Sequence, residues 1–490
     1  KKKISEKKSW ALQQFSIRFN QKNSVIMIGK NKSIHFIGIG GIGMSAIAEI
    51  LYKLGFKVTG SDINKNIIIK RLIKKGIKVF SNHSSSNIQN SDIVVFSSAI
   101  KKNNQELKFA QKKKIPTLSR ASMLAEVMRL KSSITVAGSH GKTTTTSLIA
   151  TILEKAGFDP TIINGGIINS FQTNAKLGKG EWLVAEADES DGSFVFLPST
   201  IGLINNIDLE HVDYYNNLNQ IKEAFIEYAK NIPFYGFIAL GIDSKNVRDI
   251  KDKLFEKKIF TFGLNPNANF YAKDIKIIEV KKKFFSQFDV IINFKKKKIL
   301  KNVIVPILGN HNIQNILGSI CVVKGLGVND LSIKEGLKNY EGVKRRFSII
   351  FKNQNNMIID DYAHHPQEIK KTLESLKSIT QKKIFTVFEP HRFSRLCRFL
   401  DDFIISLKYS DLIYILPIYS AGEKNKEKIS SVTIEKQLKK KFKNKFIKSV
   451  NSEKDLFNDL NKKILNGDNI IFLGAGLSSK IAYRFAKIFK

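Results

Sequence analysis

The loop at residues 137–145 is the strongest chemical signal in this sequence. It reads AGSHGKTTT, follows an apolar run at 134–136 and precedes a helical pattern at 147–153. A glycine-rich turn that enters a helix offers unpaired N–H groups to phosphate, with Lys142 as a point charge and Thr143 as a magnesium ligand. Two residues separate its glycines, where the usual phosphate-binding loop has four. The loop therefore predicts nucleoside triphosphate chemistry on a shortened motif.

A second glycine turn lies near the start of the chain. Residues 38–43 read GIGGIG between a strand pattern at 34–37 and a helical pattern at 45–54, and Asp62 follows roughly twenty residues later. This order is typical of a turn that binds a pyrophosphate at a helix N-terminus, whether in NAD or in a UDP-sugar. A turn that only packs a helix closely against a strand would contain the same glycines. A nicotinamide dehydrogenase therefore stays open on this motif alone.

Acidic and amide side chains follow two further strand patterns. Residues 186–191 read EADESD directly after the pattern at 182–185, and residues 205–213 read NNIDLEHVD after another apolar run. Carboxylates this close repel one another unless a cation or hydrogen-bond donors compensate them. A divalent ion that bridges ATP oxygens would do so, with His211 as a metal ligand or a phosphate partner. A solvated acidic loop and a structural histidine are the alternatives.

Amides and arginines occupy the remaining motifs. Residues 309–312 read GNHN, and Asn315 follows one helical turn later, a set that suits the edges of adenine or ribose. Residues 360–366 (DDYAHHP) and 390–395 (PHRFSR) each follow a strand pattern. Arginine at such a place can clamp a carboxylate with two parallel hydrogen bonds, which lysine cannot. Surface salt bridges are the alternative.

Alternating strand and helix patterns run through most of the chain and predict an α/β fold, with mostly parallel sheets between helices. For 490 residues, roughly 150 residues per domain gives about three domains. We expect a basic extension at 1–32, a Rossmann-like N-terminal domain at 33–130, a P-loop-type central ATPase domain at 131–342 and a Rossmann-like C-terminal domain at 343–490. Residues 270–305 alternate in the manner of an antiparallel hairpin region. Further strands are expected at 57–59, 92–96, 200–205, 237–240, 259–262, 357–361, 384–388, 411–416 and 469–473, and a helix at 311–326.

The formal net charge of +38 would fit a nucleic-acid or anionic membrane surface. The lysines are spread over every region, however, and do not form one stripe of arginine and aromatic side chains. No apolar run approaches the ~18 residues that span a bilayer, so we expect neither nucleic acid nor membrane insertion. Cys321 and Cys397 lie far apart in sequence, which disfavours a disulfide framework or a cysteine zinc site. A cytoplasmic location fits these features.

Taken together, the motifs resemble those of the Mur ligase family. The resemblance spans nearly the whole chain and rests on the segments 38–44, 138–145, 186–194, 206–215, 311–315, 343–347, 361–366 and 389–395. It implies an ATP-dependent ligase of peptidoglycan precursor synthesis with UDP-N-acetylmuramate and L-alanine as substrates. It also implies ATP and Mg²⁺ as cofactors, and we expect a monomer or homodimer. The basic extension and the high lysine content depart from the usual member.

The resemblance implies roles for single residues. Lys142, Glu186 and His211 would be catalytic, and Thr143, Glu186 and His211 would hold the metal ion. The ATP-binding residues would be Gly138, Ser139, His140, Gly141, Lys142, Thr143, Thr144, Asn312, Asn315 and Arg346. The UDP-sugar-binding residues would be Gly40, Gly41, Gly43, Asp62, Ser97 and Ser98. The amino-acid-binding residues would be Tyr362, His364, His391 and Arg395, and we attach no role to Glu210.

The implied reaction is phosphoryl transfer followed by acyl transfer. The lactyl carboxylate of the sugar attacks the γ-phosphate of ATP, and the amine of alanine then displaces phosphate from the acyl phosphate. Because an anion attacks a polyanion, Lys142, magnesium and the helix N-terminus must neutralise charge. The alternatives are the ligase of the same family that recycles murein tripeptide, a nicotinamide dehydrogenase, and a nucleic-acid-stimulated ATPase.

Overall fold

The computed structural model describes residues 17–20, 24–27, 32–64, 66–97, 99–211, 214–281, 283–293, 297–353, 355–426 and 428–489. Of the expected basic extension, it describes Lys32 and the antiparallel pair β1 (Ile17–Asn20) and β2 (Ser24–Met27). The predicted site residue Ser98 lies outside the described residues. The chain forms two compact units, residues 1–262 with 318–336, and residues 263–317 with 337–490.

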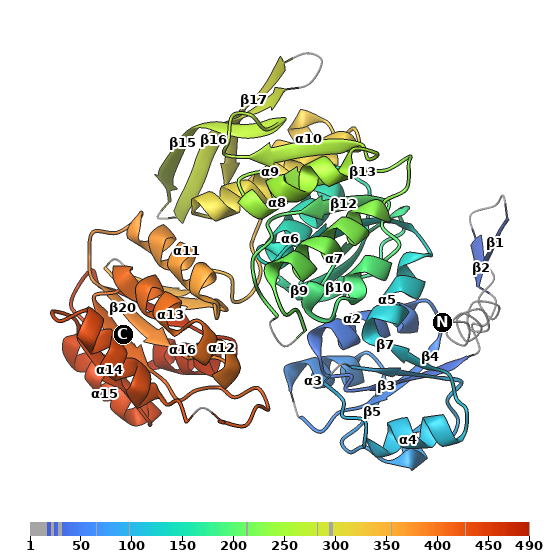
Figure 1. Ribbon diagram of the computed structural model, residues 1–490, viewed down its shortest axis with the longest axis horizontal. Coiled ribbons are helices and arrows are strands. Elements are labelled where there is room, and N and C mark those ends of the chain that lie inside the picture. Colours follow the sequence, from blue (N-terminus) through green and yellow to red (C-terminus); the bar gives the residue numbers. More distant parts are fainter. Residues whose placement is uncertain are drawn as a thin grey trace. The chain divides into compact units, whose positions relative to one another are not determined.

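The first unit begins with a five-stranded parallel sheet in the order β5-β4-β3-β6-β7 (Figure 1). Its strands are β3 (Ser33–Ile37), β4 (Lys57–Ser61), β5 (Lys78–Phe80), β6 (Ile93–Phe96) and β7 (Thr117–Ser119). Its helices are α2 (Ile42–Lys53), α3 (Ile67–Lys74), α4 (Gln105–Lys112) and α5 (Arg120–Met128), with a 3-10 turn η1 (Ser85–Ile88). The strand order reverses at β3, which lies between β4 and β6. Open parallel sheets bind ligands outside the carboxyl ends at such a reversal, where the first glycine turn lies.

A second, mainly parallel sheet forms the rest of the first unit, in the order β10-β9-β11-β8-β12-β13-β14. Its strands are β8 (Ser132–Ala137), β9 (Thr161–Ile168), β10 (Thr173–Lys176), β11 (Trp182–Glu186), β12 (Ile201–Ile204), β13 (Phe237–Gly241) and β14 (Ile259–Gly263). Its helices are α6 (Lys142–Lys155), α7 (Leu218–Lys230) and α8 (Lys245–Lys251), with 3-10 turns η2 (Glu189–Asp191), η3 (Ser193–Phe196) and η4 (Asp252–Leu254). β10 pairs antiparallel with β9, and the other pairs are parallel. Because β8 lies between β11 and β12, the segments that follow these three strands emerge side by side.

The buried residues explain why β8 and α6 are central. Only Ser132 of β8 is exposed, and α6 buries Leu148, Ile149, Ile152 and Leu153 completely together with its threonines at 145 and 146. A helix that is buried on nearly all sides belongs to the core rather than to the surface. The phosphate-type loop between β8 and α6 is therefore anchored at both ends in well-packed structure.

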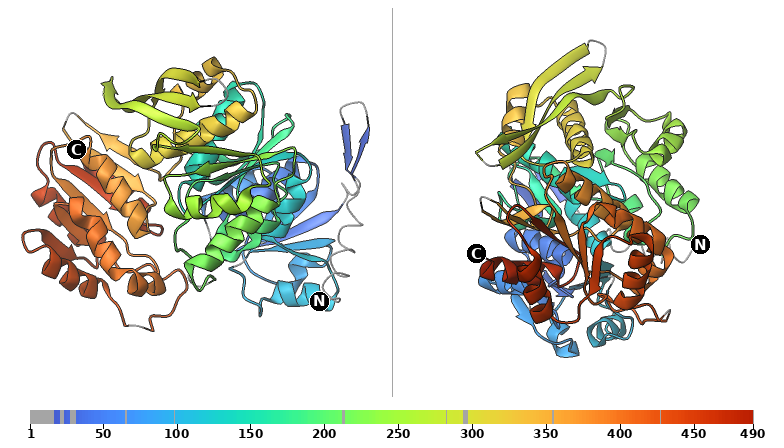
Figure 2. Two further views of the ribbon diagram at one scale, coloured as in Figure 1. Left: turned by 45° about the horizontal axis from the view of Figure 1, so that its top comes forward. Right: turned by 90° about the vertical axis from the view of Figure 1, so that its left-hand side faces the viewer.

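The second unit begins with three long consecutive antiparallel strands, β15 (Phe270–Val280), β16 (Lys283–Asn293) and β17 (Lys297–Val305). Figure 2 shows them as a twisted ribbon in yellow-green. This confirms the antiparallel hairpin region expected from the alternating pattern at 270–305. Helix α9 (Asn310–Gly325) follows, and its first half belongs to the second unit and its second half to the first. Helix α10 (Asp330–Lys338) comes next, and its residues 330–336 also belong to the first unit.

A six-stranded sheet in the order β18-β19-β23-β20-β21-β22 completes the second unit. Its strands are β18 (Ser348–Lys352), β19 (Met357–Asp361), β20 (Ile384–Phe388), β21 (Leu412–Ile415), β22 (Phe446–Ser449) and β23 (Asn469–Leu473). Its helices are α11 (Pro366–Lys377), α12 (Phe393–Arg398), α13 (Leu400–Ser406), α14 (Ser431–Lys441), α15 (Glu453–Lys463) and α16 (Ser478–Ile488), with a 3-10 turn η5 (Leu407–Tyr409). β18 is antiparallel to β19, and the other strands are parallel. The fully buried β19, β23 and β20 place the segments after β19 and β20 on either side of β23.

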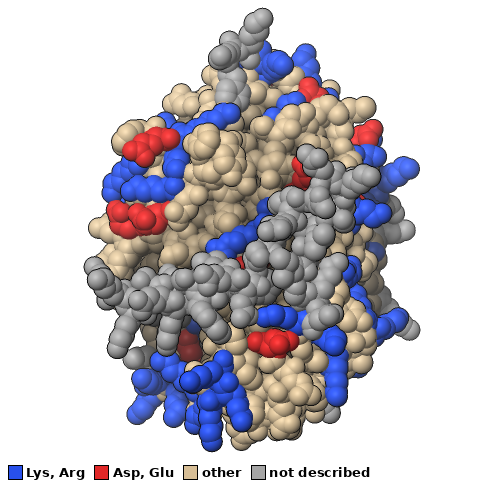
Figure 3. All heavy atoms as spheres, turned by 90° about the vertical axis from the view of Figure 1, so that its right-hand side faces the viewer, with Lys and Arg blue, Asp and Glu red and all other residues tan. Residues whose placement is uncertain are grey.

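The three-domain α/β fold class expected from the sequence is confirmed. Each strand expected from the sequence is present, with ends shifted by at most two residues. The sequence analysis missed β1, β2, β5, β7, β9, β10, β18 and β22. Among the described residues, no helix has both the length and the apolar character needed to cross a bilayer. On the face drawn in Figure 3, basic side chains form several separate groups with uncharged and acidic surface between them.

Candidate functional site

The backbone of the phosphate-type loop requires its two glycines. Gly138 has a φ of +134°, and a Cβ atom there would lie 3.1 Å from the backbone nitrogen of Asn205. Gly141, with a φ of +83°, is the N-cap of α6 and provides no side chain to cap the helix. The first N–H groups of α6 are therefore left for a ligand or solvent.

The segment after β12 braces this loop. The backbone N–H of His140 donates to Oδ1 of Asn206 at 2.8 Å, and the Asn206 amide donates back to the carbonyl of His140 at 3.2 Å. The Ser139 hydroxyl accepts from the N–H of Asp208 at 2.8 Å. Two motifs that the sequence placed on separate strands are thus joined by hydrogen bonds.

Lys142 is held in its charged form at the start of α6. Its Nζ atom donates to the carbonyl of Gly138 at 2.7 Å and lies 2.9 and 2.8 Å from the two carboxylate oxygens of Glu189. Burial disfavours the charged ammonium, but the negative charges of Glu189 and Asp188 outweigh it and raise the pKa of Lys142. The loop therefore presents a fixed positive charge.

Glu189, Glu210 and His211 form a group that could hold a cation. Each offers one ligand atom, and these atoms lie within 4.8 Å of one another. His211 Nε2 is 3.5 Å from Oε1 of Glu189 and 3.8 Å from Oε2 of Glu210. Burial lowers the pKa of His211, yet Glu189 and Glu210 raise it overall. The two carboxylates supply the oxygen ligands that magnesium prefers, whereas an imidazole is more usual at zinc and other transition metals.

The sequence analysis missed Glu189 and gave Glu210 no role. The acidic run itself was noticed, but the choice among its carboxylates depends on η2. There the Asp188 side chain accepts the N–H of Ser190 at 3.2 Å, and this turn directs buried Glu189 to Lys142. A turn-forming Asp-x-Ser pattern is a signal that could have singled out Glu189.

Glu186 lies at the end of β11, and its carboxylate contacts β9. Its Oε1 atom accepts the backbone N–H of Gly165 at 2.5 Å, and a Cβ atom at Gly165 would lie 2.8 Å from both carboxylate oxygens. Thr143 is buried in the first turn of α6. The structure therefore groups His211 with Glu189 and Glu210 rather than with Glu186. The metal-binding roles of Thr143 and Glu186 stay predictions.

The first glycine turn is organised by Asp62. Oδ2 of Asp62 accepts the N–H of Gly40 at 2.9 Å, and Oδ1 accepts the N–H of Asn64 at 2.9 Å. A Cβ atom at Gly40 would lie 2.8 Å from that Oδ2 atom, so a larger residue would displace the Asp62 side chain from the turn. Gly41 is the N-cap of α2 and offers no side-chain cap. Ser97 lies beside Gly38, where a Cβ atom would be 3.4 Å from the Ser97 Cβ.

In the second unit, four predicted residues form a chain of contacts. The ring centroids of Tyr362 and His364 lie 5.2 Å apart, and those of His364 and His391 lie 5.0 Å apart. The Arg395 guanidinium donates to Nδ1 of His391 at 3.0 Å, which leaves the imidazole proton on Nε2. Burial, with the electrostatic influence of His364 and Arg395, lowers the pKa of His391 to about 3. His391 is therefore neutral at physiological pH.

Aspartate and arginine flank this group. Asp361 ends β19, and its carboxylate accepts the N–H groups of Phe347 at 2.6 Å and Ala363 at 2.7 Å. Burial raises the pKa of Asp361 to about 6, although Arg346 and these two hydrogen bonds act against it. The Arg346 guanidinium lies 5.3 Å from the ring centroid of Tyr362. The sequence analysis named the motif that contains Asp361 but not the residue.

The two predicted adenine-binding amides lie on α9. Asn315 donates from its amide to Oδ1 of Asn312 at 3.2 Å, and Asn312 donates to the carbonyl of Leu308 at 2.7 Å. They fix each other's orientation in the first turns of the helix.

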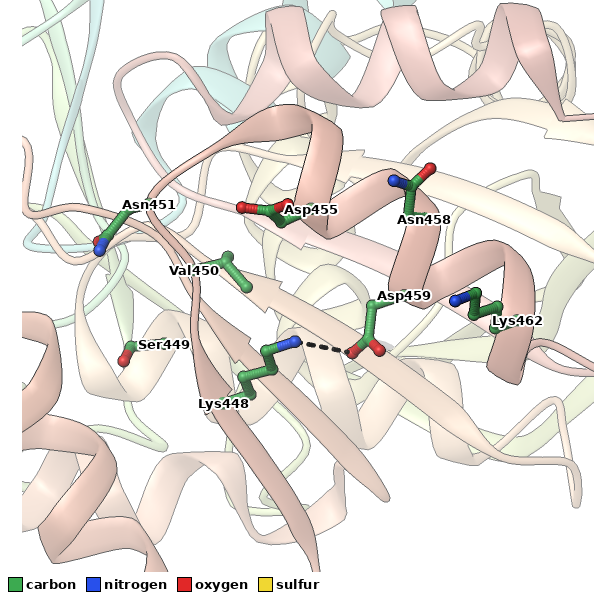
Figure 4. Close-up of a pocket in the computed structure, with 8 residues that line it drawn as sticks. All are labelled: Lys448, Ser449, Val450, Asn451, Asp455, Asn458, Asp459 and Lys462. Atoms are coloured by element: carbon green, nitrogen blue, oxygen red, sulfur yellow. Dashed lines mark ion pairs between the residues drawn. The ribbon is translucent and has the colours of Figure 1, made fainter.

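A polar pocket between β22 and α15 lies apart from these residues (Figure 4). Lys448 Nζ points across it to Oδ2 of Asp459 at 3.7 Å. None of the predicted site residues lines this pocket.

Comparisons with known proteins cover most of the chain. Residues 33–132 match the Mur ligase family, catalytic domain; residues 136–323 match the Mur ligase middle domain; and residues 345–476 match the Mur ligase, glutamate ligase domain. The UDP-N-acetylmuramate–L-alanine ligases of Rickettsia felis and Rickettsia bellii are 47% and 46% identical over 461 residues. Each alignment covers 92% of this chain and 95% of the relative.

A solved structure with a similar fold is the UDP-N-acetylmuramate-alanine ligase MurC from Thermotoga maritima. It has a TM-score of 0.78 and 27% identity, and covers 93% of this chain and 98% of its own. A murein peptide ligase from Psychrobacter arcticus shares the fold, with a TM-score of 0.69 and 22% identity over 94% of this chain and all of its own. With matches along almost its entire length, the chain belongs to the Mur ligase family.

Proposed function

We propose that this chain joins L-alanine to the lactyl carboxylate of UDP-N-acetylmuramate at the expense of ATP, a step of peptidoglycan precursor synthesis. The observation that carries this proposal is that relatives with this activity in their names align with 92% of the chain at 46–47% identity. The dehydrogenase alternative falls because the glycine turn at 38–43 belongs to a ligase domain. The nucleic-acid-stimulated ATPase falls because the phosphate-type loop belongs to the middle domain of the same family.

The phosphate-type loop and Lys142 would bind ATP. The N-terminus of α6 and the Lys142 ammonium would place positive charge where the γ-phosphate must accept an attacking carboxylate. When bound, magnesium would neutralise further charge on the phosphates. Glu189 and Glu210 would supply oxygen ligands to it, and the family resemblance gives Thr143, Glu186 and His211 as expected ligands.

The second unit would bind the amino acid. Arg395 offers a guanidinium that suits the alanine carboxylate. Neutral His391, with its proton on Nε2, can donate a hydrogen bond without adding charge. We further assign UDP-sugar binding to residues 33–130, ATP binding to residues 131–342 and amino-acid binding to residues 343–490. Asn312, Asn315 and Arg346 would contact the nucleotide, and Ser97 and Asp62 would belong to the UDP-sugar site.

We also expect magnesium dependence, a cytoplasmic location, and a monomeric or homodimeric protein. We expect the cytoplasm because the proposed substrates are ATP and a nucleotide sugar.

Phosphate release tests the proposal. Purified protein is incubated with ATP, Mg²⁺ and UDP-N-acetylmuramate. Each reaction also contains one amino-acid substrate, namely L-alanine, glycine, L-serine or the murein tripeptide L-alanyl-γ-D-glutamyl-meso-diaminopimelate. We expect turnover with L-alanine, and less with glycine and L-serine. Turnover with the tripeptide alone would instead identify the recycling ligase, and phosphate release that ignores the amino acid would contradict ligase activity.

A further inference from the structure

Arg120 is the first residue of α5 and lies against the first turn of α2. A Cβ atom built on Gly43 would be 3.2 Å from Cδ of Arg120 and 3.3 Å from its Nη1 atom. Gly43 is the last glycine of the turn at 38–43 and the second residue of α2. Glycine at this position lets the guanidinium lie on the helix backbone, close to the N–H groups that a pyrophosphate would use.

The other end of the guanidinium contacts the acidic run of the central sheet. Nη2 of Arg120 lies 3.2 Å from Oδ2 of Asp188. The Arg120 side chain is 22% exposed and that of Asp188 is 38% exposed. Burial would raise the pKa of Asp188, but the charges of Lys142 and Arg120 lower it. Arg120 therefore connects the glycine turn to the residues around the phosphate-type loop, all within the first unit.

This ion pair is suited to exchange. A partly exposed Arg–Asp pair with one long contact contributes little stability, whereas a guanidinium binds phosphate oxygens with two parallel hydrogen bonds. A helix N-terminus that has no acidic residue in its first turn and no side-chain cap adds further positive potential beside Arg120.

We infer that Arg120 is a substrate-binding residue that contacts the pyrophosphate of the UDP-sugar and leaves Asp188 when the nucleotide binds. This inference rests on the proposed UDP-sugar site. It assigns to Asp188 the role of holding the guanidinium in place in the empty protein. The pyrophosphate, rather than the lactyl carboxylate, is the partner because the guanidinium lies on Gly43 of the α2 N-terminus.

Calorimetric titration with UDP, UDP-N-acetylglucosamine and UDP-N-acetylmuramate tests the inference. Arg120→Gln should weaken binding of all three ligands by about tenfold to a hundredfold, as expected for losing a charged hydrogen bond. Arg129→Gln is the matched control. Arg129 caps the C-terminus of the same helix, is paired with Glu126 and is 44% exposed, so its replacement should leave all three affinities unchanged.

The three ligands separate the outcomes. Weakening confined to UDP-N-acetylmuramate would show a carboxylate contact and overturn the pyrophosphate assignment. Affinities unchanged in Arg120→Gln while the wild-type protein binds all three ligands would overturn the inference but not the proposed function. If the wild-type protein binds none of them, the proposed function fails first and the inference falls with it.

Asp188→Asn distinguishes ligand binding from a structural role. If Asp188 competes with pyrophosphate for Arg120, its neutralisation should tighten UDP binding by a few-fold, opposite in sign to Arg120→Gln. If Arg120 and Asp188 act only as a strut between α5 and the acidic run, both variants should weaken UDP binding alike, and the inference would be wrong. Thermal unfolding of each variant shows that the comparison is made on folded protein.

Discussion

The phosphate-type loop lies in the first unit, and the group of His364, His391 and Arg395 lies in the second. Both follow carboxyl ends of parallel strands, yet their electrostatics are opposite. Around Lys142, carboxylates raise the pKa of the ammonium and of His211 despite burial, so the ammonium stays charged. Around His391, burial and the neighbouring Arg395 lower the pKa of the imidazole to about 3. Under the proposed function, the first region would keep charge for a polyphosphate, and the second would keep a neutral donor beside an arginine for a small amino acid.

The difference shows that strand-end position alone does not set the chemistry of a site. In each site a histidine lies close to a charged side chain. Nε2 of His211 is 3.5 Å from Oε1 of Glu189, and Nδ1 of His391 is 3.0 Å from Nη1 of Arg395. The neighbouring carboxylate raises the pKa of His211 despite burial, whereas burial and the neighbouring guanidinium together lower the pKa of His391.

Replacing Lys142 should have the largest effect. Lys142→Ala removes the fixed cation from the phosphate-type loop, and we expect phosphate release to fall by about a thousandfold or more. It also leaves buried Glu189 without its main partner, so the free energy of unfolding should fall by about 3 kcal/mol. Steady-state phosphate release and thermal unfolding measure the two effects.

Two variants control this experiment. Lys155→Ala, at the other end of α6, removes an exposed pair with Glu335 and should leave phosphate release and stability nearly unchanged. The double variant Lys142→Ala with Glu189→Gln should recover stability but not activity. Full turnover by Lys142→Ala would contradict the role of the loop.

Replacing Arg395 should have the next largest effect and should act on a different kinetic parameter. Arg395→Gln removes the proposed partner of the alanine carboxylate, so KM for L-alanine should rise by about tenfold to a hundredfold. The affinity for ATP should stay the same. Arg398→Gln, at the exposed end of the same helix, is the control. A loss of ATP affinity in Arg395→Gln would contradict the assignment of ATP and the amino acid to two separate regions.

The two histidines provide a direct test of the electrostatic contrast. In NMR titrations of ¹³C-labelled histidine, with signals assigned through His211→Gln and His391→Gln, His211 should titrate above the usual value of about 6.5 and His391 near 3. Similar pKa values for both would contradict the comparison.

The same shifts fix how each histidine affects stability. Because the pKa of His211 is raised in the folded state, its contribution is complete below the unfolded pKa of about 6.5 and is lost as pH rises through the folded value. Because the pKa of His391 is lowered, its contribution is present above pH 6.5 and is lost as pH falls toward 3. The free energy of unfolding can be measured by thermal unfolding at several pH values. The stability advantage of wild type over His211→Gln should shrink as pH rises, and that over His391→Gln should shrink as pH falls.

The sequence predicted the fold well where buried strands lie in the middle of a sheet. β19, β20 and β23 are buried at every position, and their apolar runs were read with correct ends. The missed strands give weaker patterns. β5 and β7 have three residues each, β9 contains two glycines, and β18 and β22 lie at sheet edges with partly exposed residues. Tertiary pairing rather than local pattern defines such strands.

The sequence located the candidate sites by motif but not the pairing of charges inside them. It named Lys142 and His211, and the structure brings both to Glu189. Which of four neighbouring carboxylates turns inward depends on the η2 turn, which the spacing of the motif does not specify. Arg120 carries no motif of its own, because its contact with Asp188 joins residues 68 positions apart.

Replacing Asp62 should have the smallest effect on ligand binding. Asp62 lies at the first glycine turn, a third site in which the carboxylate holds backbone N–H groups and, among the described residues, no buried cation. Its carboxylate accepts two backbone N–H groups, so Asp62→Asn would leave one of them without an acceptor and loosen the glycine turn. We expect UDP binding to weaken by a few-fold, since a neutral hydrogen bond contributes about 1 kcal/mol. Asp92→Asn is the matched control, because Asp92 accepts the N–H of Ser33 at the opposite, amino end of β3. If both variants weakened UDP binding equally, the effect would reflect general stability of the sheet, and Asp62 would have no specific part in shaping the turn.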